Sequence, residues 1–444
     1  MTEDSRRLTK RMSETPSSPT RRQFLSTTAK VGAFALAAPG IIIRPSAFAA
    51  NSDTLKVGLI GCGGRGTGAA GNALTADSNC VLTAMGDVFP DQLENSYKGL
   101  KEQFDKRIQV TPDTKFTGLD AYKKVIDSGI DVVLLATPPG FRPTHLRYAV
   151  EQGRQIFCEK PLATDATGIR HALESVRMAK AKNLNLVAGF CWRSDLPRRA
   201  LYQQIHDGAI GDVRSVYGTY LTGPVKPMPA PSARKDGVTD LEWQLRNWMN
   251  FSWLAGDGFV EQCIHTVDKL AWCMKDVPPI KCTATGGRMI GNFQGNIFDH
   301  MTVVFEYANG VRATIAQRQI PGCYNDNSDY IMGTTGHALS GWNTPVIRGE
   351  KPWRYQGKAP DMYVVEHEEL FAGIRGNGPI RNDGEWLASS TLQGLMGRTA
   401  AYTGLEVTWE NMLKSQEQLG PKEIAWDMKL PIMSIPVPGQ YRLA

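Results

Sequence analysis

Two short segments carry side chains that can move a proton. The first is Glu159-Lys160-Pro161, at the end of an apolar run, and the second contains Glu261 and His265, four positions apart. A histidine has an ordinary pKa of about 6.5, so it can accept the proton of a hydroxyl at neutral pH. A lysine beside the same oxygen can stabilise a developing alkoxide and pass the proton on. These residue types suit the oxidation of an alcohol, which also needs a hydride acceptor close by.

A glycine-rich turn near the start of the chain predicts that acceptor. Gly61, Gly63 and Gly66 follow a short apolar run in a G-x-G-x-x-G pattern, and a helix-compatible run comes next. Gly61 allows a tight turn, Gly63 lets the backbone approach a pyrophosphate, and Gly66 lets helix and strand pack closely. The free N–H groups of the first helical turn then attract the anion. The intervening residues Gly64 and Arg65 are expected to contact the nucleotide as well.

The next apolar run, 80–87, ends in an acid at the position that the dinucleotide interpretation requires. Asp87 can accept hydrogen bonds from the ribose hydroxyls, and its charge would repel a 2′-phosphate. If Asp87 were an unrelated surface aspartate, its spacing from the glycine-rich turn would have no explanation. The sequence therefore predicts NAD as the cofactor. NADP remains an alternative, because the guanidinium of Arg65 can bind a phosphate.

Strands and helices alternate between about residues 55 and 190, as parallel βαβ units require. The runs 130–136 and 155–158 are apolar except for Asp131 and Gln155, which is typical of strands buried on both faces. The loops that follow such strands lie at the carboxyl edge of the sheet, where nucleotides bind. The loop residues expected at the cofactor are Thr137, Pro138, Glu159 and Lys160.

The pattern changes after about residue 210, where strands predominate. Helices are expected around 259–274 and at 385–403, and the second of these is expected to pack back on the first domain. The segments 224–240 and 340–360 are predicted to be loops. The strands of this open, mostly antiparallel sheet, with its helices on one face, are predicted at 213–222, 280–287, 298–307 and 311–320, the last two joined by a hairpin at Asn309-Gly310.

The first 49 residues resemble a twin-arginine signal peptide. The segment Thr20–Leu25 contains two arginines followed by Phe-Leu, an apolar run covers Val31–Ile43, and small residues at Ala47 and Ala49 fit a cleavage site. The apolar run is too short to span a membrane. We therefore predict export by the twin-arginine machinery to the periplasm or beyond, cleavage near Ala49, and no integral membrane span.

These elements predict an α/β protein with an N-terminal Rossmann domain, a doubly wound parallel sheet, and a C-terminal α+β domain. The predicted divisions are a signal peptide at 1–49, the nucleotide-binding domain at 50–190, a substrate-binding and oligomerisation domain at 191–420, and a tail at 421–444.

The composition fits an enzyme acting on a small molecule. Of the 444 residues 42% are hydrophobic and 21% are charged, enough for two globular cores. The net charge of +6 comes mainly from the first 49 residues, so there is no basic patch and no nucleic-acid partner is predicted. Most of the eight cysteines lie in apolar surroundings without a C-x-x-C pair, which predicts buried thiols rather than disulfides.

The glycine turn with its acid, the E-K-P motif and the segment around His265 together resemble the Gfo/Idh/MocA oxidoreductases, over about residues 55–420. The segment Arg398–Gly404 also resembles exported members of this family. Members pair the E-K-P lysine with an Asp-x-x-x-His helix motif. Carried over, the lysine is Lys160 and the histidine is His265, whereas Glu261 stands where the family has aspartate. Glutamate keeps the charge but moves it by one methylene, which can re-aim its contact to substrate or lysine.

The resemblance has further implications. It implies a nicotinamide cofactor and a sugar, polyol or sugar-acid substrate, and it implies that Thr137 and Pro138 border the nicotinamide ribose. The Lys160-Pro161 bond is often cis in this family. A homo-oligomer built on the second sheet is implied as well. Because export separates the enzyme from the cytoplasmic NAD pool, the cofactor is expected to stay bound while one substrate is oxidised and another reduced.

Substrate contacts are less clearly specified. Arg193 follows a predicted strand and is expected to face the cleft between the domains. The rings of Trp243 and Trp253 could stack on a sugar, and Arg246 could bond its hydroxyls. Placement of these tryptophans in the core explains their presence equally well, and the same ambiguity holds for His300.

Other interpretations of the catalytic residues remain open at this stage. His265 alone would more often be a core histidine, and Lys160 alone a solvated loop lysine. Glu261, His265 and Asp268 could together coordinate a metal ion. Zinc sites usually need a further strong ligand, so no metal is predicted.

Two other functions are weighed against the oxidoreductase. One is a glycoside hydrolase or lyase that oxidises its sugar transiently with bound NAD, although family glycosidases lack the E-x-x-x-H-x-x-D pattern of this chain. The other is a non-enzymatic sugar-binding protein on the same fold, which would leave the pairing of Lys160 and His265 without a purpose.

Overall fold

The computed structural model describes residues 53–290 and 295–442. The predicted twin-arginine signal, with its cleavage site near Ala49, lies outside these residues. The described residues form one compact unit. Within the described part of the chain, no helix is long and apolar enough to cross a membrane.

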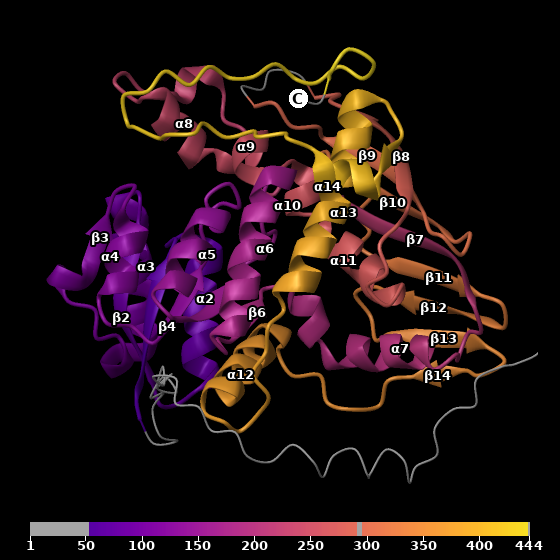
Figure 1. The fold of residues 1–444 in the computed structure, drawn as a ribbon, viewed down its shortest axis with the longest axis horizontal. Helices are drawn as coiled ribbons and strands as arrows, with labels where there is room; N and C mark the ends of the chain where they lie inside the picture. Colours follow the sequence, from indigo (N-terminus) through magenta and orange to yellow (C-terminus); the bar gives the residue numbers. More distant parts are fainter. Residues whose placement is uncertain (1–52, 291–294, 443–444) are drawn as a thin grey trace, which may run out of the picture. The chain divides into compact units, whose positions relative to one another are not determined.

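The first sheet is parallel and has six strands in the order β3-β2-β1-β4-β5-β6 (Figure 1). This confirms the predicted Rossmann fold. The strand order reverses between β1 and β4, so their loops diverge and leave a crevice at the carboxyl edge. The strands are β1 (Leu55–Ile60), β2 (Cys80–Asp87), β3 (Lys115–Thr117), β4 (Val132–Leu135), β5 (Gln155–Cys158) and β6 (Leu186–Ala188).

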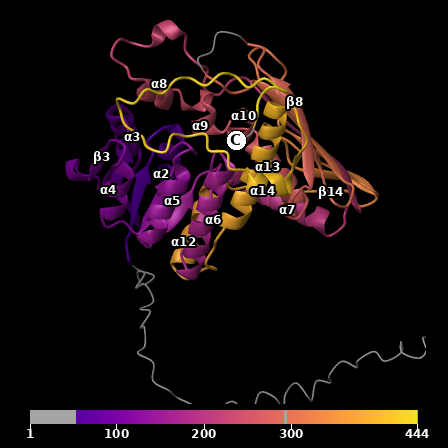
Figure 2. The ribbon, with the colours of Figure 1, turned by 45° about the horizontal axis from the view of Figure 1, so that its top comes forward.

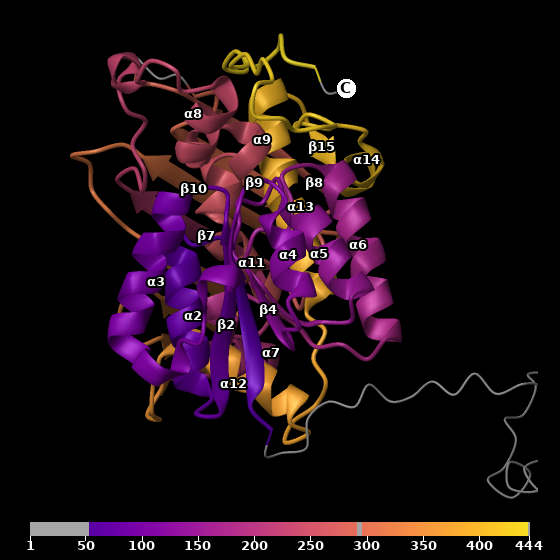
Figure 3. The same cartoon turned by 90° about the vertical axis from the view of Figure 1, so that its left-hand side faces the viewer.

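Helices cover both faces of this sheet (Figure 3). Residues of β1 alternate between the faces: Leu55, Val57 and Leu59 pack with α2 and α3, whereas Ile60 packs with α4, α5 and α6. Asp165 caps α6 by accepting a hydrogen bond from the Gly168 N–H. The helices are α2 (Gly64–Ala76), α3 (Pro90–Phe104), α4 (Ala121–Asp127), α5 (Arg142–Glu151) and α6 (Ala166–Ala181).

A helix from much later in the chain completes the face that α2 and α3 cover. Leu370, Phe371 and Ile374 of α12 (Met362–Ile374) are buried with the apolar residues of β1 and α2. Just after this helix, Arg375 pairs with Asp77 at the end of α2, with a shortest N···O distance of 2.5 Å. The nucleotide-binding layer therefore depends on a segment that follows most of the second sheet.

The second sheet has nine strands in the order β14-β13-β12-β11-β7-β10-β9-β8-β15, antiparallel except for the parallel pair β7 and β10. The predicted open, mostly antiparallel sheet is thus confirmed. Gly310 takes a φ of +82° in the predicted hairpin between β9 and β10. The strands are β7 (Val213–Thr222), β8 (Lys281–Gly287), β9 (His300–Glu306), β10 (Arg312–Gln319), β11 (Asp329–Gly333), β12 (Gly336–Ser340), β13 (Val346–Gly349), β14 (Trp353–Arg354) and β15 (Val407–Thr408).

The prediction of a loop over 340–360 is wrong, because the edge strands β13 and β14 lie there. Both are very short and are formed by pairing with β12 and with each other, so they carry little local strand pattern. The other predicted loop, 224–240, is irregular apart from a 3-10 turn at Pro231–Ala233 and the first residue of α8.

Helices pack on one face of the second sheet (Figure 1). The longest, α13, contacts α6 of the first layer as well as β8 and β9, so it joins the two sheets. This confirms that the predicted helix at 385–403 packs back on the first domain. The remaining helices are α7 (Leu196–His206), α8 (Asp240–Arg246), α9 (Ser252–Ala255), α10 (Gly258–Glu261), α11 (Ile264–Cys273), α13 (Gly384–Thr403) and α14 (Trp409–Lys414).

The described chain ends in a segment without helix or strand, residues 415–442, which we call the C-terminal strap. It runs across α8 and α9 (Figures 1 and 2). Leu419, Ile424, Met428 and Leu430 of the strap pack against a buried cluster that includes Phe89 and the apolar residues of α8 and α9. The strap therefore covers α8 and α9, which lie next to the carboxyl edge of the first sheet.

Candidate active site

A cavity of about 580 Å³ opens at the carboxyl edge of the first sheet. One side comes from the loops of the first sheet and the other from the segment 226–249 of the second domain. Residues that line it are Gly61, Gly63, Gly64, Arg65, Gly66, Asp87, Val88, Phe89, Gln92, Gly118, Leu119, Ala136, Thr137, Pro138, Phe141, Lys226, Leu245, Arg246, Trp248 and Met249.

The glycine turn has the shape that a pyrophosphate needs. Gly61 takes a φ of +93°, and a Cβ on Gly66 would lie 1.8 Å from the Gly61 carbonyl oxygen, so only glycine fits there. A Cβ on Gly63 or Gly64 would meet nothing within 4 Å, because these residues border open space. Helix α2 begins at Gly64, so its first N–H groups lie beside the cavity. The turn thus fits the pyrophosphate of a dinucleotide.

Asp87 lies at the end of the cavity that a ribose would occupy. Its Oδ2 accepts a hydrogen bond from the Cys62 N–H at 2.7 Å, and its Oδ1 accepts one from the Phe89 N–H at 2.9 Å. A carboxylate oxygen has two lone pairs, so each oxygen can still accept a ribose hydroxyl. Burial raises the pKa of Asp87, and the backbone hydrogen bonds oppose that shift.

Arg65 is held by other groups at the opposite end of the turn. Its Nε lies 2.7 Å from Oε1 of Glu159, and its guanidinium lies 4.8 Å from the centre of the Tyr363 ring on α12. One edge of Arg65 is therefore already neutralised by a carboxylate. This arrangement connects the glycine turn to the E-K-P motif and leaves Arg65 poorly suited to a 2′-phosphate near Asp87.

The two strand-end loops are held together by Arg142, a buried residue that the sequence analysis does not single out. Its guanidinium donates hydrogen bonds to the carbonyl oxygens of Thr137 and Pro161. The Thr137 hydroxyl also pairs with Nδ1 of His145 at 3.1 Å. The peptide bond before Pro161 is cis. Arg142 thus fixes the position of the loop that carries Lys160.

Lys160 and Glu261 form a buried ion pair across the two domains. The Lys160 Nζ lies 3.0 Å from Oε1 of Glu261 and also donates to the Glu261 carbonyl oxygen at 2.6 Å. Their side chains are only 10% and 9% exposed. The longer glutamate side chain therefore reaches the lysine, and Gln262 Nε2 donates to its other oxygen.

His265 is close to this pair but belongs to a separate helix. Helix α10 ends at Glu261 and α11 begins at Ile264, so Glu261 and His265 do not face each other along one helix as their spacing suggests. Among the described residues, Nδ1 of His265 has no hydrogen-bond partner. Burial, followed by the positive charges of Lys160, Lys269 and Arg65, lowers the pKa of His265 well below its usual value. The imidazole is therefore neutral at pH 7 and able to accept a proton.

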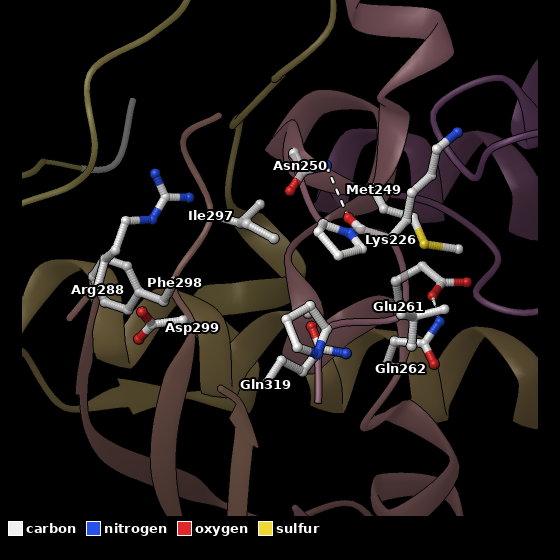
Figure 4. Close-up of a pocket in the computed structure, with 14 residues that line it drawn as sticks. Lys226, Met249, Asn250, Glu261, Gln262, Arg288, Ile297, Phe298, Asp299 and Gln319 are labelled. Atoms are coloured by element: carbon white, nitrogen blue, oxygen red, sulfur yellow. Dashed lines mark hydrogen bonds between the residues drawn. The ribbon is translucent and has the colours of Figure 1, made fainter. Parts of the chain in front are cut away.

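A second pocket, of about 50 Å³, adjoins the large cavity and shares Lys226 and Met249 with it (Figure 4). Glu261 lies on one side of this pocket and Arg288 on the other. No sequence motif points to its remaining polar residues, although Asp299 and Gln319 lie within predicted strands. The polar residues that line the pocket are Lys226, Asn250, Glu261, Gln262, Arg288, Asp299 and Gln319.

The four predicted substrate residues lie outside this small pocket. Trp243 and Trp253 are buried in the apolar cluster under the strap, and the Trp253 N–H donates to Gln244. Arg193 pairs with Asp268 and Asp276. Arg246 lines the large cavity instead. The side chain of His300, the other ambiguous residue, pairs with Asp299.

No group of three or more metal-ligating side chains occurs within 53–290 and 295–442. All eight cysteines lie in these ranges and are free thiols, and Cys323 is the exposed one. The cysteines predicted to be buried, at 62, 80, 158, 191 and 263, are buried.

Comparisons with known proteins agree with this architecture. Residues 55–190 match the family model "Oxidoreductase family, NAD-binding Rossmann fold", and residues 199–339 match the "GFO/IDH/MocA C-terminal domain". Together the two matches cover more than half of the chain.

Individual relatives are more distant. The chain is 26% identical to an inositol 2-dehydrogenase of Rhizobium meliloti over 346 residues, which are 74% of this chain and 93% of that protein. It is 29% identical to a glycosyl hydrolase family 109 protein of Streptomyces coelicolor over 47% of this chain and 46% of that one. The WlbA dehydrogenase of Bordetella pertussis, solved with NADH and UDP-GlcNAcA, has the same fold, with a TM-score of 0.62 and 18% identity over 80% of this chain and 98% of that chain.

Proposed function

Because the chain belongs to the Gfo/Idh/MocA family of NAD-binding oxidoreductases, we propose that it transfers hydride between NAD and a carbinol carbon of a sugar, polyol or sugar acid. One observation carries this proposal. The buried Lys160–Glu261 pair joins the E-K-P loop to a small polar pocket, and that pocket shares two wall residues with the dinucleotide cavity. A hydroxyl held in the pocket would thus lie beside the cofactor.

We assign separate roles to three residues: Glu261, which lines the pocket, Lys160, which pairs with Glu261, and His265, whose pKa is lowered by burial and by the charge of Lys160. Lys160 and His265 are not among the residues that line the pocket. The bound nicotinamide supplies the hydride acceptor. His265, neutral at pH 7, accepts the hydroxyl proton on a ring nitrogen. The Lys160 ammonium donates a hydrogen bond to the same oxygen and stabilises its developing negative charge. Glu261 holds Lys160 in place through its carboxylate and its carbonyl oxygen.

A polyhydroxylated substrate fits the composition of the small pocket. Amide, carboxylate and cationic groups line it, and these can bond several hydroxyls at once. A relative that aligns over 93% of its own length is called an inositol 2-dehydrogenase. Both observations support a ring-shaped polyol or sugar as the substrate class.

The place of action and the assembly are also proposals. Export by the twin-arginine pathway, suggested by residues 1–49, would place the enzyme away from the cytoplasmic NAD pool and favours a cofactor that is retained between turnovers. The segment 226–249 over the cavity supports retention. The second sheet exposes Tyr217, Tyr330 and Met332 on the face away from its helices, which supports a homo-oligomer through that face.

The first experiment uses protein purified after export. Nucleotide released by denaturation is identified, and absorbance at the reduced-nicotinamide band is followed while a panel of sugars and polyols is added. We expect bound NAD that one ring polyol or sugar reduces. Lys160→Met should lower kcat by about 10²- to 10⁴-fold with NAD binding retained, whereas Lys180→Met, at a lysine side chain that is 68% exposed, should change neither.

Two outcomes would overturn this proposal. A protein that binds neither NAD nor NADP would contradict the role of the glycine turn and Asp87. Full turnover in Lys160→Met would contradict the catalytic assignment.

The similarity to a glycosyl hydrolase family 109 protein keeps a second candidate function in view. In that case the sugar would be oxidised and reduced again within one turnover, so aryl glycosides would be cleaved without net formation of NADH. Cleavage of an aryl glycoside that depends on bound NAD would favour the hydrolase. Net reduction of NAD by a free sugar favours the dehydrogenase.

A further inference from the structure

The second domain supplies a cation to the adenosine end of the dinucleotide cavity. Arg246, the last residue of α8, lines the cavity together with Asp87 and Phe89. Its guanidinium lies 3.9 Å from the centre of the Phe89 ring. Because Phe89 follows Asp87 by two positions and donates its N–H to the Asp87 carboxylate, Arg246 lies close to the site of the adenosine ribose.

Two carboxylates hold this guanidinium. The Arg246 Nη1 and Nη2 donate to Asp91, in the first turn of α3, at 3.2 and 3.3 Å, and Nε donates to Glu242 at 2.8 Å. The hydrogen bonds from Arg246 lower the pKa of Asp91, which is therefore ionised at neutral pH. Asp91 thus takes one N–H from each terminal nitrogen of Arg246, the two nitrogens that would bind a phosphate in bidentate fashion.

The charges around this end of the cavity add up to an acidic surrounding. Asp87, Asp91 and Glu242 carry three negative charges, against the two positive charges of Arg246 and of Lys226, whose Nζ donates to the Arg246 carbonyl oxygen. A ribose with a free 2′-hydroxyl is neutral and tolerates this surrounding, whereas a 2′-phosphate carries nearly two further negative charges. Arg65, the other arginine in the cavity wall, is engaged by Glu159 at the far end of the glycine turn.

We propose that the Arg246–Asp91 pair is a second determinant of cofactor choice: Asp91 occupies the guanidinium that would otherwise bind a 2′-phosphate, and so enforces selection of NAD. The inference rests on the proposed function, since it assumes a dinucleotide in the cavity. It predicts that removing the charge of Asp91 frees Arg246 for a phosphate, even with Asp87 in place.

Binding constants of NAD and NADP, measured by calorimetric titration of nucleotide-free protein, test this inference without any need for the sugar substrate. Asp91→Asn should strengthen NADP binding by about tenfold, the effect of about one charge-assisted hydrogen bond, and should change NAD binding by less than about threefold. Glu94→Gln is the matched control. Glu94 lies on the same helix, is similarly exposed and pairs with Lys115, so its variant removes the same charge without touching Arg246. It should leave both constants unchanged.

The double variant Asp91→Asn/Arg246→Ala identifies the group that binds the phosphate. We expect it to lose the tenfold gain in NADP affinity. A gain that persists without Arg246 would overturn the proposal, as would NADP binding that Asp91→Asn does not change while NAD still binds. Absence of binding of either nucleotide to the unmodified protein would instead contradict the proposed function, so the two failures are distinguishable.

Discussion

At the scale of single residues, the surroundings of His265 keep its ring neutral. Its ring is buried, and three cations, Lys160, Lys269 and Arg65, disfavour the addition of a fourth charge nearby. Lys160 is itself kept in place by Glu261. The site thus separates the two tasks of proton removal: a neutral group receives the proton, and a charged group stabilises the oxygen left behind.

The lowered pKa of His265 predicts an unusual pH profile. An ordinary histidine would be about 90% protonated at pH 5.5, and kcat/KM for oxidation would then fall about tenfold from its value at pH 7.5. Because the folded protein lowers this pKa, the imidazole stays neutral as the pH falls through 6.5. We expect kcat/KM to fall less than about threefold between pH 7.5 and 5.5. A steep acid limb centred near pH 6.5 that disappears in His265→Gln would contradict this assignment.

The residue types of the site could be predicted from the sequence, but their pairing could not. Lys160, Glu261 and His265 are recognisable from short motifs. The helix is interrupted between Glu261 and His265, but no proline in the sequence indicates this interruption. There the N–H groups of Gln262 and Cys263 both donate to the Gly258 carbonyl oxygen, a wider turn that ends α10. Such widened turns are frequent at functional sites, and here the turn directs Glu261 toward Lys160 instead of His265.

At the scale of elements, α8 contributes to the wall of the dinucleotide cavity and the C-terminal strap packs on α8. Buried Gln244 on α8 connects them, since its Nε2 donates to the Leu430 carbonyl oxygen at 2.8 Å and its Oε1 accepts from the Trp253 N–H at 2.7 Å. Leu430 N–H donates in turn to Asp240. The next residues along α8, Leu245 and Arg246, line the cavity. A change at Gln244 should therefore reach the cofactor.

We predict that Gln244→Leu loosens this wall. The substitution leaves the Trp253 N–H and the Leu430 carbonyl oxygen without a partner, at a cost of about 1 to 3 kcal/mol. Hydrogen exchange should quicken in 419–432, and NADH should dissociate at least about threefold faster in a stopped-flow chase. The same substitution at exposed Gln103 on α3 should change neither rate. Unchanged exchange in the strap would contradict the role of Gln244.

Elements with a strong local pattern were predictable, and those that depend on distant partners were not. The strands β1, β2, β4 and β5 are apolar runs that end in loops, and they lie where the sequence places them. Helix α12 lacks such a pattern, because four polar residues in succession, 366–369, interrupt its apolar stretch. Two of them, Glu366 and His367, are buried all the same, a placement that only the tertiary packing determines.

At the scale of the whole molecule, buried imidazoles couple stability to pH. Burial lowers the pKa of His145 and His367 to about 3, and lowers that of His265 as well. The ring of His145 is stacked against Tyr122 with centres 4.0 Å apart, which leaves no room for a hydration shell. These groups stay neutral in the folded protein at pH values where the unfolded chain is protonated.

The sign of the resulting pH dependence follows from proton uptake. Below pH 6.5 the unfolded state binds protons that the folded state does not, so the free energy of unfolding falls with the pH, by up to about 1.4 kcal/mol per pH unit for each imidazole. We expect urea unfolding of His145→Gln between pH 6.5 and 5 to show a slope smaller by about one proton than that of the unmodified protein. His337→Gln, at an exposed histidine on β12, should keep the original slope. Equal slopes for the unmodified protein and His145→Gln would contradict the neutral state of His145.

The late position of α12 has a consequence for how the protein is made. A ribosome completes β1 to β6 and then most of the second sheet before it reaches residue 362. Until then Leu55, Val57 and Leu59 of β1 lack part of their cover, because Leu370, Phe371 and Ile374 do not yet exist. The nucleotide-binding layer of a nascent chain therefore stays open on one face throughout most of translation. This face of the nucleotide-binding layer is thus completed only near the end of synthesis.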